Sequence, residues 1–145
     1  MGDAPHLPPP PDPRMLPVLG AVTYVAAVIA LWGFVSLALD ADAIRQRDAG
    51  PLLGPAMVAG AVVVTFVALL RVRNRQAPTV AALVCAASVY VVMLAIGAVG
   101  YATIRADASW LVLFVGGYAL SPFVLGAALL GGLAVVAVWA ATRRA

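Results

Sequence analysis

The sequence predicts an all-α membrane protein, a four-helix transmembrane bundle with both termini in the cytoplasm. First, the 145 residues are 64% hydrophobic with a mean hydropathy of +1.04, whereas soluble domains are about 45–50% apolar. Second, uncharged runs of about twenty residues recur, which is the length that crosses a hydrocarbon core of about 30 Å. Third, arginines gather between and after these runs, a pattern typical of cytoplasmic loops.

Residues 1–16 differ from the rest of the chain because they are rich in proline, reading MGDAPHLPPPPDPRML. Proline lacks a backbone donor and favours an extended polyproline conformation. We expect a proline-rich cytoplasmic tail that acts as a spacer, with docking into an aromatic groove as the alternative. Residues 17–145 then form the four-span membrane domain.

Four spans are expected, at about 17–39, 52–70, 78–101 and 122–141. The first has 23 uncharged residues, so it reaches roughly 35 Å at 1.5 Å per residue. Pro17 suits a first helical turn, where a missing N–H costs nothing. The later spans begin after or at prolines, which indicate breaks in the backbone.

The uncharged stretch 110–141 is too long for a single crossing, because 32 residues would make a helix of roughly 48 Å. Gly116-Gly117 and Ser121-Pro122 indicate a break before the last span. We therefore expect 110–120 to form an extra short apolar segment, interfacial or re-entrant. The alternative is one long helix with a kink at Pro122.

The arginines predict the orientation. The expected inner side holds six arginines and the outer side three, which agrees with the positive-inside rule; they are Arg14, Arg71, Arg73, Arg75, Arg143 and Arg144 inside, and Arg45, Arg47 and Arg105 outside. We expect Arg71, Arg73, Arg75, Arg143 and Arg144 to fix the topology and anchor the chain to anionic lipid. Nucleic acid is excluded as a partner, because the arginines flank apolar runs and form no patch interleaved with aromatics.

The sequence contains no catalytic, cofactor-binding or metal-binding motif. The expected spans hold no Asp, Glu, Lys, Arg or His, and such residues mark proton relays and ion paths in membrane proteins. Cys85 is the single cysteine, and we interpret it as a small packing residue. The tyrosines at 24, 90, 101 and 118 are interpreted as packing residues that could hydrogen-bond between helices.

A set of charged residues falls in the two expected outer loops: Asp40, Asp42, Arg45, Arg47, Asp48, Arg105 and Asp107. The favoured interpretation is solvated charges that pair with one another, each pair contributing about 0–1 kcal/mol. The alternative is a docking surface for a partner, or a cation site made of aspartates.

The segments DAGPLLGPAM, which opens the second span, and SPFVLGAALL, which opens the fourth, give the chain a recognisable pattern. In this pattern it resembles uncharacterised small four-helix integral membrane proteins of actinobacteria. The resemblance implies a bacterial plasma membrane and a multi-pass protein, and it implies no activity.

Three functions are compatible with these observations. The leading hypothesis is a non-catalytic accessory or assembly subunit that packs against a larger membrane complex, with the lipid bilayer and a membrane protein, or a second copy, as partners. The alternative is a small homo-oligomeric transporter or pore without intramembrane ionisable groups. A membrane enzyme is the least favoured, and no cofactor is expected.

Overall fold

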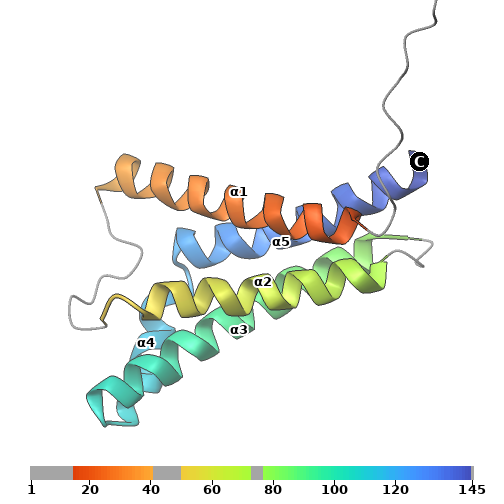
Figure 1. The fold of residues 1–145 in the computed structure, drawn as a ribbon. Coiled ribbons are helices and arrows are strands. Elements are labelled where there is room, and N and C mark those ends of the chain that lie inside the picture. Colours follow the sequence, from red (N-terminus) through yellow and green to blue (C-terminus); the bar gives the residue numbers. More distant parts are fainter. Residues whose placement is uncertain (1–14, 41–49, 73–76, 145) are drawn as a thin grey trace, which may run out of the picture.

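The computed structural model describes residues 15–40, 50–72 and 77–144, and these residues form five helices with no strand (Figure 1). The expected tail at 1–16 lies outside the described residues up to position 14, as does most of the first expected outer loop. The helices are α1 (Leu16–Leu39), α2 (Leu53–Val72), α3 (Thr79–Arg105), α4 (Ser109–Tyr118) and α5 (Pro122–Arg144).

Four of these helices, α1, α2, α3 and α5, are long and apolar enough to cross a membrane. This confirms the all-α expectation with four long apolar helices and indicates a multi-pass membrane protein. The shorter apolar helix α4 is separate from α5, as expected for the 110–120 segment. A single long kinked helix is not formed.

The third long helix continues beyond its expected end at residue 101, because Arg105 is still helical. Ala106 then adopts a left-handed conformation with φ of 53°, and its N–H donates to the carbonyls of Ala102 and Thr103. This ending satisfies carbonyls that a helix terminus would leave without partners. The connection between α3 and α4 is therefore only residues 106–108, and α4 follows α3 at once.

The break between α4 and α5 has a simple local cause. Pro122 is the first residue of α5 and supplies no N–H, so it suits a helix start and not a helix interior. The Ser121 N–H donates to the Tyr118 carbonyl at 2.9 Å, and the Leu125 N–H donates to the Ser121 carbonyl at 3.0 Å. The chain therefore turns at 119–121 and begins a new helix.

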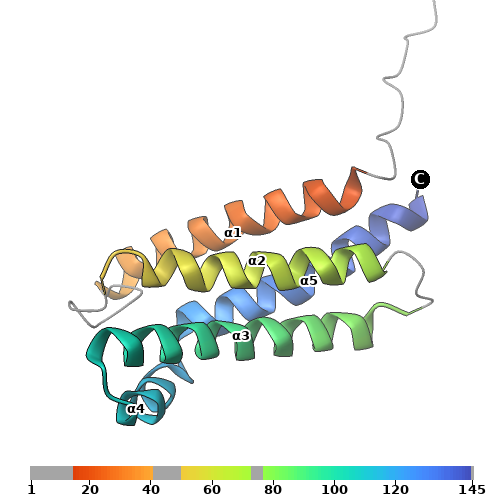
Figure 2. The same cartoon turned by 60° about the horizontal axis from the view of Figure 1, so that its bottom comes forward.

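Helices α2, α3 and α5 each contact three other helices, and α5 packs against α1, α2 and α3. The start of α1 and the end of α5 lie at the same end of the structure as the end of α2 and the start of α3, as Figures 1 and 2 show. The opposite end carries α4, which lies beside α3 (Figure 2). We call these the terminal end and the α4 end.

Buried positions recur every fourth residue on the two middle helices. In α2 they include Met57, Ala61, Thr65 and Leu69, and in α3 the stripe runs from Cys85 through Val89, Met93 and Gly97 to Tyr101. Such stripes let the ridges of one helix enter the grooves of its neighbour. The core is therefore a set of interlocked stripes with no charged residue among its buried side chains in the described part of the chain.

The closest approach of α5 to α3 depends on a glycine. A Cβ atom at Gly132 would lie 3.2 Å from the Ala82 carbonyl oxygen and 3.5 Å from the Ala86 Cβ. Small residues at such a contact let two helix backbones come together, which is how helices associate in lipid. Gly60 plays a similar part on α2, where it lies against Val92 and Ile96 of α3.

Replacing Gly132 by Leu should therefore force α5 away from α3 and lower the thermal unfolding midpoint in mild detergent. Overpacking of this kind costs about 1–3 kcal/mol. Gly33→Leu in α1 is the matched control, because nothing lies within 4 Å of a Cβ there. Equal midpoints for the two variants would contradict the close α3–α5 contact.

Candidate functional site

The interior of the protein contains a line of backbone carbonyls that accept hydrogen bonds from side chains of other helices. The four acceptors are the carbonyl oxygens of Ala119, Phe123, Ala127 and Gly131. Those of Phe123, Ala127 and Gly131 are four residues apart and lie along one face of α5, and Ala119 precedes them in the turn between α4 and α5. We call these four carbonyls the carbonyl stripe.

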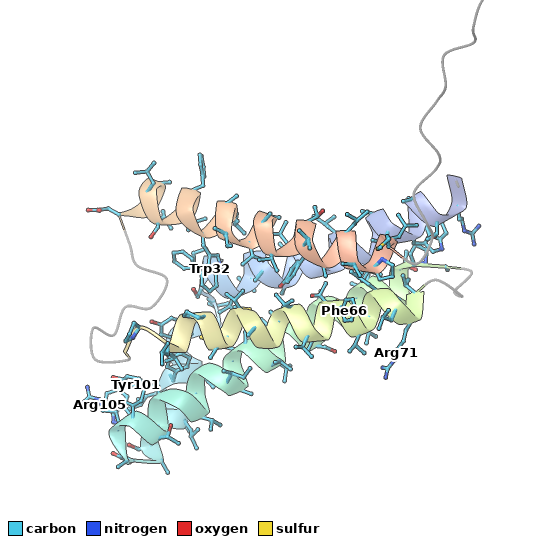
Figure 3. All side chains as sticks on the ribbon, viewed as in Figure 1. Trp32, Phe66, Arg71, Tyr101 and Arg105 are labelled. Carbon is cyan, nitrogen blue, oxygen red and sulfur yellow. The ribbon has the colours of Figure 1, made fainter. Side chains whose placement is uncertain are left out.

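Each acceptor in the carbonyl stripe meets a donor from α1 or α3. From α1, the Trp32 Nε1–H donates to the Phe123 oxygen at 3.1 Å and the Tyr24 hydroxyl donates to the Ala127 oxygen at 3.2 Å. From α3, the Tyr90 hydroxyl donates to the Ala119 oxygen at 3.0 Å, and the Cys85 Sγ lies 3.7 Å from the Gly131 oxygen. Figure 3 shows Trp32 pointing inward from α1.

These bonds tie α1 and α3 to the same helix through polar contacts that lipid cannot replace. Tyr and Trp carry large apolar rings with one donor each, so they fill the core and still require an acceptor when buried. The Trp32 ring also meets the Phe123 ring edge-on, with centroids 5.8 Å apart. The carbonyl stripe therefore sets the positions of α1 and α3 relative to α5.

Thr65 of α2 is the only buried side chain in the described residues whose oxygen has no hydrogen-bond partner. Its Oγ1 lies close to the Tyr24 hydroxyl and the Cys85 thiol, but neither meets it at hydrogen-bonding geometry. A Cβ at Gly131 would lie 3.3 Å from this oxygen, so the absence of a side chain at Gly131 makes space for the Thr65 side chain. Each of the four long helices thus brings a polar group to this buried region: Tyr24 from α1, Thr65 from α2, Cys85 from α3 and the Gly131 carbonyl from α5.

A second cluster lies at the α4 end, where Arg105 packs on aromatic rings (Figure 3). Its Nε–H donates to the Tyr101 hydroxyl at 3.2 Å, and its guanidinium carbon lies 4.9 Å from the centre of the Trp110 ring. Tyr101 is fully buried, and its ring meets Trp110 edge-on at 5.3 Å. A guanidinium over an aromatic face is attractive, so Arg105 joins the end of α3 to the start of α4.

Helix α4 is held against α3 by one face only. Phe114 is buried against Gly97, where a side chain would collide with its ring, and it stacks on Tyr118 at a centroid distance of 4.3 Å. The other face is apolar and exposed, with Val112 at 77% and Leu113 at 58% exposure. Nothing lies within 4 Å of a Cβ placed at Gly116 or Gly117.

Asp107 starts α4. Its Oδ1 accepts the Ser109 backbone N–H at 2.9 Å, and this hydrogen bond holds the pKa of the exposed Asp107 carboxyl below its usual value. A carboxylate at the start of a helix also suits the positive end of the helix dipole. Asp107 therefore stays ionised at neutral pH and helps α4 to begin directly after the turn.

The residues expected in an outer docking surface are only partly brought together. Arg105 and Asp107 lie beside each other in the turn from α3 to α4, and Asp40 is the exposed residue that ends α1 at the same end. Asp42, Arg45, Arg47 and Asp48 lie outside the described residues. Of this set, Arg105 packs on aromatic rings, and the docking surface as a whole stays a prediction.

The residues expected to anchor the chain to lipid lie at the terminal end. Arg71 is exposed in the last turn of α2, Arg143 has its guanidinium carbon 4.4 Å from the centre of the Trp139 ring, and Arg144 is the last residue of α5. Arg73 and Arg75 lie outside the described residues. Arg71, Arg143 and Arg144 thus lie at one end of the protein, as expected for an arginine-rich side.

Thr65, the indole donor of Trp32 and the backbone carbonyl acceptors were not predicted from the sequence. The spacing of Tyr24 and Trp32 could have predicted that both donors point toward the same neighbouring helix, because they are eight residues apart and lie on one helical face. No comparable signal identifies a carbonyl, since every residue has one.

The groups of the carbonyl stripe and its donors contribute hydrogen bonds and packing between helices. No group of three or more His, Cys, Asp or Glu that could hold a metal ion occurs among the described residues. The donors to the carbonyl stripe are hydroxyl, indole and thiol groups, each of which supplies one hydrogen for a hydrogen bond. The interior is thus suited to fixing helices.

Comparison with known proteins gives a family. The chain matches the description "Family of unknown function (DUF6121)" over residues 13–144, a range that includes all five helices. Neither the curated proteins nor the solved structures contain a match.

Two conservative substitutions should separate the paired hydroxyl from the unpaired one. Tyr24→Phe removes the bond to the Ala127 oxygen and should lower stability in detergent by about 0.6–1 kcal/mol, as for other interhelical bonds in membrane proteins. Thr65→Val keeps the shape and removes a buried hydroxyl without a partner, so stability should stay equal or rise. Thermal unfolding of both variants checks this, and a loss for Thr65→Val as large as that for Tyr24→Phe would show that Thr65 has a bonded partner.

Proposed function

We propose that this chain, which belongs to the family of unknown function DUF6121, is a non-catalytic membrane protein that packs laterally against another membrane protein as an accessory or assembly subunit. The observation that carries the proposal is the outward face of α4. A glycine pair there has nothing to pack against within the described chain, although each glycine weakens a helix by about 1 kcal/mol relative to alanine. The two glycines would let a transmembrane helix of a partner approach the α4 backbone closely at Gly116 and Gly117.

The membrane placement supports such a partner. We place the terminal end in the cytoplasm of a bacterial cell, because Arg71, Arg143 and Arg144 lie there and arginine favours the inner side. Both termini are then cytoplasmic, and α4 belongs to the outer leaflet.

We interpret α4 as re-entrant and not as a helix lying flat on the membrane. Phe114 sits on Gly97, which is eight residues and about 12 Å before the end of α3. Leu120, after α4, is 85% exposed, and an apolar side chain so exposed belongs in lipid or against another protein. The outward face of α4 would then meet its partner inside the outer leaflet.

The buried chemistry favours a packing role over transport or catalysis. Proton and ion paths through membranes normally use Asp, Glu, His, Lys or Arg, and the described interior holds none of these among its buried side chains. The remaining candidate is a homo-oligomeric pore, which would need a path lined by hydroxyls and carbonyls. The carbonyl stripe is an unsuitable lining, because its four oxygens already accept bonds from α1 and α3.

The expected result of a gentle-detergent purification of the tagged native protein is co-migration with a second membrane protein on a native gel. Gly116→Leu should reduce the recovery of that protein roughly tenfold, since a clash of this size costs about 1–3 kcal/mol. Gly33→Leu is the control, because it adds the same side chain at another open position. Mass spectrometry identifies and quantifies the co-migrating protein.

A homo-oligomer without a second protein, together with ion or solute flux in liposomes that contain only this chain, would contradict the accessory role and establish the pore. Equal recovery with Gly116→Leu and the native chain would remove α4 as the contact surface.

A further inference from the structure

A groove between α2 and α3 at the terminal end has a shape and charge that suit one kind of molecule. Its volume is about 230 Å³, and its walls include Val64, Val67 and Ala68 from α2 and Val80, Ala81 and Val84 from α3. Arg71, in the last turn of α2, also lines it. The groove lies at the opposite end of the protein from α4, so its occupant is independent of the proposed partner.

The walls require an apolar occupant. Val80 and Val84 are 66% and 60% exposed, so the groove opens toward the surroundings of the helices and is not an enclosed cavity. Alanines at 68 and 81 make the hollow, because valines flank them on both helices. The lining also includes Cys85 and Ser88. The valines and alanines that make up most of it offer no hydrogen bond, so they favour a hydrocarbon chain over a polar solute.

The mouth requires an anion. Arg71 is exposed and extends outward from the last turn of α2 (Figure 3), and it contacts no ionic partner among the described residues. The start of α3 faces the same mouth, since Val80 and Ala81 line the groove with Arg71. No side chain caps that helix start, so its free N–H groups add positive potential.

An apolar occupant of the groove and an anion at its mouth are combined in an amphiphile with a negatively charged headgroup. Helix α2 has 20 residues, which is about 30 Å and matches the hydrocarbon thickness. Arg71 therefore lies at the level where lipid phosphates begin. We infer that this groove binds one anionic phospholipid, with an acyl chain along the valines and alanines and the phosphate at Arg71.

The test uses the full chain purified in mild detergent and native mass spectrometry with added phosphatidylglycerol or phosphatidylcholine of identical acyl chains. The native protein should retain one phosphatidylglycerol in preference to phosphatidylcholine. Arg71→Gln should reduce that preference roughly fivefold, which is the effect of one arginine near an anionic lipid surface. Arg143→Gln is the matched control, because it removes the same charge at the same end while lying on the Trp139 ring and outside the groove.

The apolar half of the site has its own variants. Ala81→Phe and, as a second choice if that chain folds poorly, Ala68→Leu should fill the hollow and reduce the retention of both lipids. Unfolding temperatures measured with phosphatidylglycerol should rise for the native chain and for Arg143→Gln, and rise less for the groove variants.

Three results would overturn the inference. An equal loss of preference in Arg71→Gln and Arg143→Gln would mean that surface charge alone selects the lipid. Undiminished retention in both Ala81→Phe and Ala68→Leu would mean that no acyl chain occupies the groove. Displacement of phosphatidylglycerol by an equal concentration of glycerol 3-phosphate would mean that the site binds a free phosphate anion.

Discussion

Polar groups carried into a membrane need partners inside the protein, and in this chain the partners are backbone carbonyls of α5 and of the turn that precedes it. Tyr24 and Trp32 reach them from α1, and Tyr90 and Cys85 reach them from α3. Donors eight residues apart on α1 reach carbonyls four residues apart, and donors five residues apart on α3 reach carbonyls twelve residues apart. Each bond therefore joins one specific pair of positions. The requirement to satisfy buried donors in lipid therefore fixes how the helices align, and small residues such as Gly131 and Gly132 allow the approach that the bonds need.

The break between α4 and α5 belongs to the same arrangement. The carbonyl of Ala119 lies in the break, and the Tyr90 hydroxyl donates to it. Arg105, Trp110 and Phe114 then hold α4 against the end of α3. One end of the protein is in this way packed with aromatic rings, while the terminal end carries arginines and an apolar groove. An accessory role at one end and a bound lipid at the other fit this division.

Much of the fold could be predicted from the sequence, because hydropathy and charge report directly on the solvent around a helix. The four long helices and the separate segment before Pro122 follow from run lengths and from proline and glycine positions. The extension of α3 to Arg105 could not be foreseen, since it depends on the packing of Arg105 on Tyr101 and Trp110. The pairing of Tyr24 with Ala127, 103 residues away, likewise depends on tertiary contacts that no local pattern encodes.

The depth of the α4–α5 break tests the account most directly. A spin label at Leu120→Cys, in a Cys85→Ala background because Cys85 is the single cysteine, reports its exposure to oxygen or to a water-soluble relaxant in liposomes. Labels at Leu129 and Asp40 supply the references for the middle of α5 and for the end of α1. Oxygen accessibility at 120 close to that at 129 is the predicted result. Accessibility to the water-soluble relaxant equal to that at 40 would place α4 on the membrane surface and contradict the re-entrant arrangement.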